Sequence, residues 1–322
     1  MDLTGKKVLV TGGAGFIGSH LCEELLNLGA EVLTIDNLFT GKVENMSTFK
    51  DNAKFKFIEA DVNDREAIAP LFETFKPDYV FHYAAILGVK RVIEQPLLVL
   101  DDIDGFKNVL ELSKEHGVRK LVFSSSSEAY GNMAELPLKE DAGREIEHQT
   151  HSTSLYALVK VIGEKMMKVY NDKYGLPTVS LRFFNVFGPR QESSAYGFVV
   201  GVFINQIIAG DNPTIFGDGY QTRDFIFIKD NIRMALKTLF TDAVNGEVIN
   251  IGVGRQTTIL DLAEKIIKIS GKDLKPQFLP ARPYEIKYRS PDVSKMQRLL
   301  EEKIEDKFEE HLKTTYDSYQ KN

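Results

Sequence analysis

The 322-residue sequence predicts an α/β fold in which a parallel sheet carries helices on both faces. Short apolar runs alternate with helix-length amphipathic segments throughout the first half of the chain, which is the order of a doubly wound sheet. The first apolar run also leads into glycines spaced three apart, Gly12, Gly15 and Gly18, directly before a helical pattern. A strand, a glycine turn and a helix in this order are typical of a Rossmann fold.

The alternation of apolar runs and helical patterns defines the expected elements up to residue 184. We predict strands at residues 7–11, 31–36, 55–60, 79–84, 120–125 and 178–184. We predict helices between them at residues 16–28, 64–75, 97–116 and 152–174. Residues 1–184 are therefore expected to form one dinucleotide-binding domain.

The regular alternation of predicted strands and helices ends beyond Pro189. We predict a helix at 198–209, a strand at 213–216, a helix at 229–240, a strand at 247–251 and two further helices. The last helix is expected to span 294–316 and to dock through an apolar stripe formed by Leu299, Leu300, Ile304, Phe308 and Leu312. We expect residues 185–322 to form mainly a smaller α/β substrate-binding domain, with some segments packing back on the sheet.

Composition excludes several classes of protein. The formal net charge of −6 argues against a nucleic-acid-binding surface. No apolar stretch approaches the roughly 20 residues that span a bilayer, and no signal-peptide pattern is present, so a cytoplasmic location is expected. Cys22 is the only cysteine, which excludes an intramolecular disulfide, and we expect it to be a buried structural thiol.

An acidic residue at the end of the second predicted strand bears on the choice of cofactor. The glycines permit a tight turn, close approach of the backbone to a pyrophosphate, and packing of helix on strand. Asp36 follows Gly18 by 18 residues and precedes Asn37. An aspartate at this place hydrogen-bonds the adenosine ribose hydroxyls and repels the 2′-phosphate of NADP. We therefore expect NAD rather than NADP.

Two further strand ends are expected to approach the cofactor. Asp61 and Val62 close the third strand, where the acid is placed to meet the adenine amino group. His82 is expected to be a core histidine, whereas the small residues Ala84 and Ala85 let the backbone come close to the cofactor. The expected cofactor-binding residues are Gly12, Gly15, Phe16, Ile17, Gly18, Asp36, Asn37, Asp61, Val62, Ala84, Ala85, Tyr156 and Lys160.

Tyr156 and Lys160 form a candidate acid/base pair, because their spacing of four places phenol and ammonium on one face of a helix. A tyrosine acts as a general base only when its pKa lies well below its usual value of about 10. We expect Lys160 and the positive charge of an oxidised nicotinamide to lower the pKa in this way. The tyrosinate then removes a hydroxyl proton while the adjacent carbon gives hydride to NAD, and Ser126 orients the hydroxyl.

Five segments of the chain together resemble one enzyme family. They are Thr11–Leu21, Phe123–Gly131, Tyr156–Lys160, Leu181–Arg190 and Gly217–Phe225. In them the chain resembles the extended short-chain dehydrogenase/reductase family of NAD-dependent nucleotide-sugar epimerases, dehydratases and decarboxylases, which includes UDP-glucose 4-epimerases. The resemblance covers essentially the whole chain. It implies a Rossmann NAD-binding domain followed by a nucleotide-sugar-binding domain.

The resemblance also implies roles for particular residues. Ser126 stands at the position of the family's catalytic serine. Asn185 and Arg223 are implied to contact the substrate diphosphate, for which a guanidinium fork is well suited. Arg282 and Arg289 lie in the segment that often closes over the nucleotide in this family.

The chain departs from the family pattern at a few positions. Asp102 and Asp104 stand where asparagine is usual, and Phe106 stands where threonine is usual. Val159 replaces the serine that usually precedes the lysine of the Tyr-x-x-x-Lys motif. These changes leave both catalytic side chains of that motif in place.

The helices predicted at 97–116 and 152–174 carry apolar positions beyond those needed on one face. Pairing these helices between two copies of the chain would bury the extra positions in a four-helix interface, which the family resemblance also implies. We therefore expect a homodimer that binds a nucleoside-diphosphate sugar, and neither a nucleic acid nor a membrane.

Glu128 bears on which reaction follows oxidation of the sugar at C4. An acid at this position resembles decarboxylases and 4,6-dehydratases, but Ser127 replaces the aspartate of the dehydratase pair, and the broader sequence resembles epimerases. We predict a UDP-hexose 4-epimerase with Ser126, Tyr156, Lys160 and Glu128 as catalytic residues. A dehydratase, a UDP-glucuronate decarboxylase and a 4-dehydrogenase are the alternatives within the family.

Two hypotheses from other functional classes have less support in the sequence. A non-catalytic NAD-binding sensor or scaffold would usually have lost the tyrosine or the lysine, and this chain has both. A metal hydrolase has little support, because His148 and His151 lie three apart in a polar loop without a third ligand. No metal is expected.

Overall fold

The computed structural model of the chain describes residues 1–86, 94–95, 97–133, 135–143, 153–192, 198–282 and 286–320. The chain divides into two compact units, each assembled from three segments. The first unit comprises Met1–Gly131, Ile146–Arg182 and Ile232–Ile249, and the second comprises Asn132–Glu145, Phe183–Asn231 and Asn250–Asn322. The first unit is built mainly from the N-terminal half of the chain and also includes Ile232–Ile249. The second unit is built mainly from the C-terminal half and also includes Asn132–Glu145.

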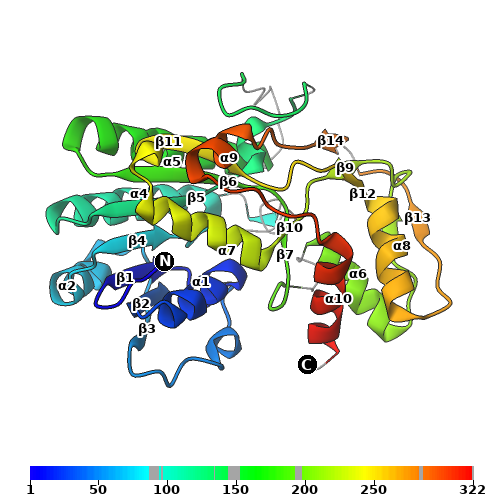
Figure 1. Ribbon diagram of the computed structural model, residues 1–322, viewed down its shortest axis with the longest axis horizontal. Coiled ribbons are helices and arrows are strands. Elements are labelled where there is room, and N and C mark those ends of the chain that lie inside the picture. The colour runs from blue at the N-terminus through cyan, green and yellow to red at the C-terminus, as the bar shows by residue number, and fades with distance from the viewer. Residues whose placement is uncertain are drawn as a thin grey trace. The chain divides into compact units, whose positions relative to one another are not determined.

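A seven-stranded sheet forms the centre of the first unit (Figure 1). Along the chain its strands are β1 (Lys7–Thr11), β2 (Glu31–Asp36), β3 (Phe55–Glu59), β4 (Tyr79–His82), β5 (Lys120–Ser126), β6 (Thr178–Phe183) and β11 (Glu247–Ile251). Across the sheet the order is β11-β6-β5-β4-β1-β2-β3. The pairs β1–β2, β2–β3, β1–β4 and β4–β5 are parallel. This order confirms the predicted α/β fold with a doubly wound sheet.

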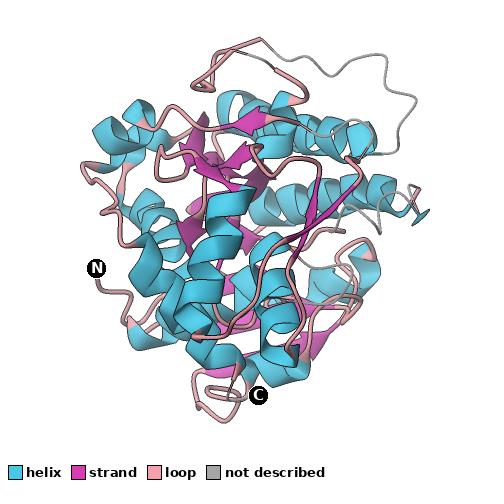
Figure 2. Ribbon diagram, turned by 90° about the vertical axis from the view of Figure 1, so that its right-hand side faces the viewer, coloured by secondary structure: helices cyan, strands magenta, loops and turns pink. Residues whose placement is uncertain are grey.

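Helices cover both faces of this sheet. They are α1 (Phe16–Asn27), α2 (Arg65–Phe75), α4 (Leu98–Glu115) and α5 (Thr153–Tyr174), with 3-10 turns η1 (Val43–Met46), η2 (Ser127–Tyr130), η3 (Thr238–Phe240) and η4 (Asp242–Val244). The strands β1, β2 and β3 follow one another toward one edge of the sheet, and the chain then returns to place β4 on the opposite side of β1. Because crossovers between parallel strands are right-handed, α1 lies on one face, and the layer of α2, α4 and α5 lies on the other (Figure 1). Figure 2 shows helices on either side of the strands.

The strand sequences explain why both faces are covered. Every residue of β6 is buried, and in β1 only the first residue is not. Strands that are buried along their whole length are typical of parallel sheets held between two layers of helices, although β6 also buries the polar residues Thr178, Ser180 and Arg182. The core between the sheet and α2, α4 and α5 includes Leu9, Phe72, Phe106 and Phe123, all fully buried.

The strand β4 ends two residues earlier than the sequence predicts. The sheet pairing stops at His82, and the backbone of Tyr83 and Ala84 instead bonds to Thr11 at the end of β1. This is the point where the strand order reverses, and ligands of doubly wound sheets bind outside the carboxyl ends of the strands at such a point.

The second unit contains shorter strands and, among its described residues, four α-helices of its own. Its elements are β7 (Val186–Phe187), α6 (Val199–Ala209), β8 (Thr214–Phe216), β9 (Thr222–Arg223), β10 (Ile226–Phe227), β12 (Thr257–Thr258), α8 (Ile259–Ser270), β13 (Gln277–Leu279), β14 (Tyr288–Arg289), α9 (Ser294–Leu300) and α10 (Phe308–Tyr319). The strands form three small sheets, β10-β7, β12-β9-β14 and β13-β8. The residues of α7 (Ile228–Lys237) divide between the two units.

The C-terminal helix predicted at 294–316 is wrong, because two helices stand in its place. The first, α9, ends where Glu301 takes a left-handed conformation with φ of 50°, which no helix continues through. The second, α10, starts at Phe308. Two residues of the predicted apolar stripe are nevertheless buried, Leu300 at the end of α9 and Ile304 in the segment between the two helices.

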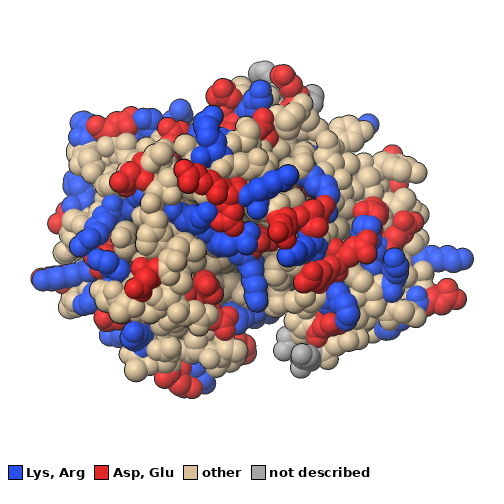
Figure 3. Space-filling model, in the orientation of Figure 1, with Lys and Arg blue, Asp and Glu red and all other residues tan. Residues whose placement is uncertain are grey.

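Charged side chains of both signs are interspersed on the face shown in Figure 3. Within the part of the chain that the structure describes, no helix combines the length and the apolar character needed to cross a membrane. Cys22 lies fully buried on α1, in agreement with a structural thiol.

Candidate active site

The glycine turn joins the ends of β1 and β4 to the start of α1. A side-chain Cβ at Gly12, where φ is +77°, would lie 2.7 Å from the backbone nitrogen of Ala84. A Cβ at Gly18 would lie 2.1 Å from the carbonyl oxygen of Gly12. Only glycine therefore allows these three backbones to pack together. No side chain caps α1 at Gly15, so the N–H groups of its first turn suit a phosphate.

Asp36, at the end of β2, is hydrogen-bonded to the glycine turn. Its two carboxylate oxygens accept hydrogen bonds from the backbone N–H of Ala14 at 3.0 Å and of Leu38 at 2.9 Å. Burial raises the pKa of this carboxyl, against the effect of these hydrogen bonds. The adjacent Asn37 donates a hydrogen bond to the carboxylate of Asp61 at 3.0 Å. The structure thus places three of the expected cofactor-binding residues side by side.

His82 lies buried at the end of β4. Its Nδ1 shares a hydrogen bond of 2.8 Å with the hydroxyl of Thr11. Burial, aided by the charge of Lys160, lowers the pKa of His82 to about 3, so the imidazole is neutral. It therefore serves as a core histidine that joins β1 to β4, as the sequence suggests.

The three side chains of the predicted catalytic group meet at the carboxyl end of β5. Ser126 is the last residue of that strand, and its hydroxyl is hydrogen-bonded to the phenol of Tyr156 on α5. Lys160 follows one turn later, with its Nζ 5.6 Å from the centroid of the Tyr156 ring. Lys160 also donates a hydrogen bond of 3.0 Å to the carbonyl of Ser124. A strand end and one helix face therefore bring a hydroxyl, a phenol and an ammonium together.

Taken together, the protein's own groups raise the pKa of Tyr156. Burial raises it above the ordinary value of 10.0, while the hydrogen bond to Ser126 lowers it and the carboxylates of Asp102 and Glu128 raise it. Burial also lowers the pKa of Lys160 to about 8. In the chain without a cofactor, burial therefore outweighs the surrounding groups, and the lowering expected from Lys160 together with an oxidised nicotinamide stays a prediction.

Glu128 lies in η2, two residues after Ser126. It is half-buried, and its backbone N–H donates a hydrogen bond of 3.2 Å to the Ser126 hydroxyl. Its charge acts on the Tyr156 phenol. Glu128 thus belongs to the same group of side chains as the serine and the tyrosine.

Sequence reasoning missed a buried ion pair behind this group. Glu164 on α5 accepts hydrogen bonds from Arg182 on β6 at 2.7 Å and 2.9 Å, and neither side chain is more than 1% exposed. Ser125 donates a third hydrogen bond to Glu164 at 2.6 Å, and the guanidinium lies 4.4 Å from the Tyr130 ring centroid. The network ties together β5, η2, α5 and β6. In the sequence, the one indication of this buried ion pair was the arginine within the predicted strand at 178–184.

Arg223 and Arg289 are neighbours in the second unit. Strand β14 pairs parallel with β9, and in this register Arg289 stands opposite Arg223. Buried Asp224 accepts hydrogen bonds from the N–H groups of residues 253–255 at 2.7–2.9 Å, which holds the loop behind this pair.

The other two residues expected to contact substrate are also in the second unit. Asn185 is half-buried, and its side chain donates a hydrogen bond of 3.0 Å to the carbonyl of Asp224. Arg282 is exposed, and its guanidinium lies 4.0 Å from the centroid of the Phe216 ring. Asn185 therefore lies beside the segment that carries Arg223, whereas Arg282 stacks on β8.

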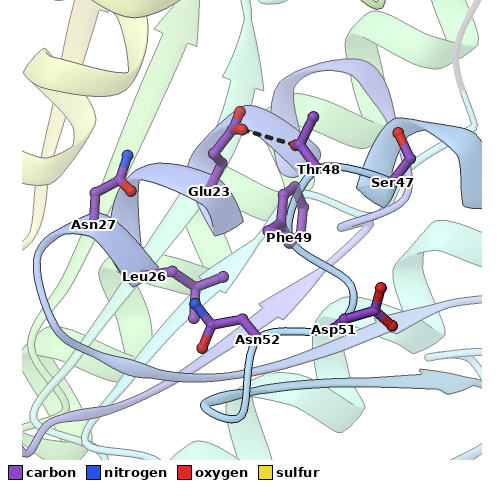
Figure 4. A pocket seen from close by; sticks show the side chains of 8 residues that line it. All are labelled: Glu23, Leu26, Asn27, Ser47, Thr48, Phe49, Asp51 and Asn52. Carbon is purple, nitrogen blue, oxygen red and sulfur yellow. Dashed lines mark hydrogen bonds between the residues drawn. The ribbon is translucent and has the colours of Figure 1, made fainter.

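The pocket drawn in Figure 4 lies at the far end of α1 from the glycine turn. Its lining residues are Glu23, Leu26, Asn27, Ser47, Thr48, Phe49, Asp51 and Asn52, with a hydrogen bond of 2.8 Å from Thr48 to Glu23. It contains none of the expected site residues. Among the described residues, no cluster of His, Cys, Asp or Glu is suited to hold a metal ion, and His148 and His151 fall outside that part of the chain.

Known proteins resemble this chain along most of its length. Residues 8–252 match the model of the NAD dependent epimerase/dehydratase family. The UDP-glucose 4-epimerase of Mycolicibacterium smegmatis is 34% identical over 296 residues, which are 91% of this chain and 92% of that protein. The UDP-N-acetyl-alpha-D-glucosaminuronate decarboxylase of Bacillus cytotoxicus is 34% identical over 317 residues, which are 96% of each chain.

A solved structure extends the similarity to three dimensions. The crystal structure of UDP-glucuronic acid 4-epimerase from Bacillus cereus, in complex with UDP-glucuronic acid and NAD, has a TM-score of 0.87 to this chain at 35% sequence identity. The similarity covers 98% of this chain and 99% of that chain.

Proposed function

Because this chain belongs to the NAD dependent epimerase/dehydratase family, we propose that it is a 4-epimerase of a nucleoside-diphosphate hexose. The observation that carries the proposal is the meeting of Ser126, Tyr156 and Lys160 at the carboxyl end of the sheet. A general base, a hydroxyl that orients the substrate and a nearby cation are what oxidation of a sugar hydroxyl requires.

The proposed roles of these residues follow from their contacts. Tyr156 takes the proton of the C4 hydroxyl, and Ser126, already hydrogen-bonded to the phenol, holds that hydroxyl in line. A bound NAD would supply the hydride acceptor for the oxidation at C4 and the hydride that is returned to the other face of the sugar. Lys160 holds the nicotinamide ribose, and its charge, together with the positive charge of the oxidised ring, opposes the raised pKa of Tyr156.

The first unit fits an NAD molecule through its backbone and through Asp36. The uncapped start of α1 suits the pyrophosphate, and Gly12, which has no side chain, packs closely on the backbone of Ala84. The Asp36 carboxylate, held by the glycine turn, suits the ribose hydroxyls. We assign NAD binding to the first unit and nucleotide-sugar binding mainly to the second.

Arg223 and Arg289 are proposed to bind the diphosphate of the substrate. Their paired register gives two guanidinium groups for two phosphates, and Asn185 lies beside them as a further donor. A UDP-hexose is the substrate class that we propose, because the similar 4-epimerases act on UDP-sugars. Incubation with UDP-, GDP-, dTDP- and CDP-hexoses, followed by NMR of the products, tests this. An absence of C4 inversion in every case would reject the proposal.

A decarboxylase is the second candidate, favoured by the position of Glu128 beside Ser126 and by the similar Bacillus cytotoxicus enzyme. For a 4-epimerase we expect Glu128→Gln to change turnover by less than about tenfold, because no proton transfer depends on this group. For a decarboxylase or dehydratase the same change would block the step after oxidation. NADH absorbance and product mass in a single turnover separate the two, since a trapped keto sugar appears only in the second case.

Cofactor preference is expected to depend on Asp36. The wild-type protein should bind NADH more tightly than NADPH. Asp36→Ala should lower the ratio of the two affinities by about tenfold or more, because it removes the repulsion of the 2′-phosphate. Glu59→Ala is the matched control, since Glu59 lies opposite Asp36 on β3 but is exposed. Fluorescence titration with both cofactors measures the ratio. Tighter binding of NADPH by the wild type would contradict the assignment.

We also propose that the protein is a homodimer. Leu158, Ile162 and Val169 are exposed along α5, and Leu100 is exposed on the adjacent α4. A second copy of these helices would cover this apolar stripe. We expect light scattering to show a dimer at micromolar concentration and Ile162→Asp to shift it to monomer, whereas Val43→Asp, at another exposed apolar site of the same unit, should not. A monomeric wild type would refute the dimer.

A further inference from the structure

The segment that follows β2 folds back onto the glycine turn and contacts it at Ala14. The carbonyl oxygen of Ala14 accepts two hydrogen bonds from this segment, one at 2.9 Å from the backbone N–H of Lys42 and one at 2.8 Å from the side-chain amide of Asn45. The N–H of Ala14 donates to the Asp36 carboxylate at 3.0 Å. Ala14 is fully buried, so its backbone groups need such partners. One residue of the turn thus joins Asp36 to Asn45.

Ala14 lies between two glycines of the turn, directly before α1. Its carbonyl and the N–H of Gly15 belong to one planar peptide group. That N–H donates to the carbonyl of Gly12 at 3.2 Å, so both sides of the peptide are held. Gly15 is the N-terminal cap residue of α1 and supplies no side-chain hydrogen bond. The bonds to the Ala14 carbonyl therefore fix the peptide that leads into the first turn of the helix, where a pyrophosphate is expected.

The side chain of Asn45 is placed by the 3-10 turn η1. Its backbone N–H donates to the carbonyl of Lys42 at 3.0 Å, and the next residue, Met46, is buried. A side chain on a free segment would lose conformational freedom on binding, whereas η1 already holds this amide close to Ala14. The hydrogen bond from Asn45 therefore links η1 to a turn that lies 31 residues earlier in the chain.

Gly41 brings the backbone of the same segment against the Asp36 carboxylate. A Cβ at this position would lie 2.7 Å and 2.8 Å from the two carboxylate oxygens, and 2.9 Å from the Cβ of Ala14. The oxygens also accept hydrogen bonds from the N–H groups of Ala14 and Leu38. The carboxylate is therefore enclosed by the glycine turn on one side and by residues 38–41 on the other. Its position depends on how closely this segment packs on the turn.

We propose that Asn45 is a positioning residue for cofactor selection. By holding residues 37–46 on Ala14, its amide keeps the Asp36 carboxylate at the place where it accepts hydrogen bonds from the adenosine ribose and repels a 2′-phosphate. Asn45 acts through Ala14 and Asp36, and Gly41 supports it by leaving room for the carboxylate. This role of Asn45 rests on the proposed contact of Asp36 with the ribose and is independent of the sugar reaction.

Loss of the Asn45 amide should lower the preference for NADH over NADPH. Without it, residues 37–46 lose one of two hydrogen bonds to the Ala14 carbonyl, so the Asp36 carboxylate moves more freely. NADH then loses part of a well-placed contact, whereas NADPH escapes part of a repulsion. We expect Asn45→Ala to lower the ratio of the two affinities by about three- to tenfold, the scale of one net hydrogen bond. Fluorescence titration with NADH and with NADPH measures this ratio.

Asn52→Ala is the matched control for this measurement. Asn52 lies in the same connection between β2 and β3, but it is exposed, and its amide oxygen accepts a hydrogen bond of 2.9 Å from the N–H of Lys54. Its replacement should leave both affinities unchanged. An equal weakening of both cofactors by Asn45→Ala would mean that the amide supports only the pyrophosphate turn, and would overturn its role in selection. An unchanged ratio with unchanged affinities would overturn it as well.

A double-mutant cycle shows whether Asn45 acts through Asp36. In an Asp36→Ala background the carboxylate is absent, so the further change Asn45→Ala should alter the affinity ratio by less than about twofold. An effect as large as in the wild-type background would mean that Asn45 reaches the cofactor by another route, and the proposal would be wrong.

Gly41→Ala tests the same carboxylate from the other side and remains informative if Asn45→Ala does not fold. The added methyl group would displace the carboxylate or move the segment off the turn, so the affinity ratio should fall by about threefold or more although Asn45 is intact. Gly143→Ala is the control, because a Cβ there meets nothing within 4 Å. Unfolding temperatures measured without cofactor show whether each variant is folded. A wild-type ratio in folded Gly41→Ala would contradict the enclosed carboxylate.

These measurements use no nucleotide sugar, so they remain valid if no C4 inversion is found. If the wild type itself binds NADPH more tightly, the assignment of Asp36 fails and that of Asn45 fails with it. If the wild type prefers NADH while Asn45→Ala keeps the wild-type ratio, only the role of Asn45 is overturned.

Discussion

Replacing Tyr156 with phenylalanine is expected to lower turnover by at least about 100-fold, the usual scale for the loss of a positioned acid/base. The change removes one oxygen from a phenol that is hydrogen-bonded to Ser126, and it leaves the ring in place over α5. Binding of the nucleotide sugar should change little, because Arg223 and Arg289 are untouched. Steady-state rates and the affinity for the sugar nucleotide, measured separately, check both parts.

Tyr170→Phe provides the control, since it makes the same change on the same helix away from Ser126. It should retain near-wild-type turnover. Ser126→Ala should also lower turnover more than substrate affinity, because the hydroxyl orients the substrate and does not hold its diphosphate. A Tyr156→Phe variant with near-wild-type turnover would remove Tyr156 from its proposed role.

Breaking the buried ion pair behind the site is expected to cost about 3–5 kcal/mol of unfolding free energy. Arg182→Met leaves the Glu164 carboxylate buried without its cation, and it also removes the guanidinium from the Tyr130 ring. The double replacement of both residues by methionine should recover most of the loss, because it removes the uncompensated charge. Urea unfolding of the three variants measures these differences.

Lys168→Met is the matched control for this experiment. Lys168 forms an ion pair with Asp172 on the same helix α5, but both side chains are about half exposed. Water screens such a pair, so little change in stability is expected. If Arg182→Met cost no more than Lys168→Met, the buried network would not be what holds β5, α5 and β6 together.

The sequence by itself determined the fold and the centre of the site, because both depend on local patterns. A strand, a glycine turn and a helix are contiguous, so the backbone packing of Gly12 and Gly18 could be inferred from their spacing. Tyr156 and Lys160 are one helical turn apart, which places them together in any helix. Apolar runs buried on both faces required a sheet between two layers of helices.

The tertiary structure alone decided the contacts between residues that are distant in the sequence. The register of β14 on β9 places Arg289 opposite Arg223, and packing of α5 on β6 joins Glu164 to Arg182. Such partners depend on register and packing, which no local pattern encodes. The pKa of Tyr156 likewise depends on its burial and on all the charges around it. The spacing of a motif therefore located the phenol, whereas only the folded surroundings set its proton affinity.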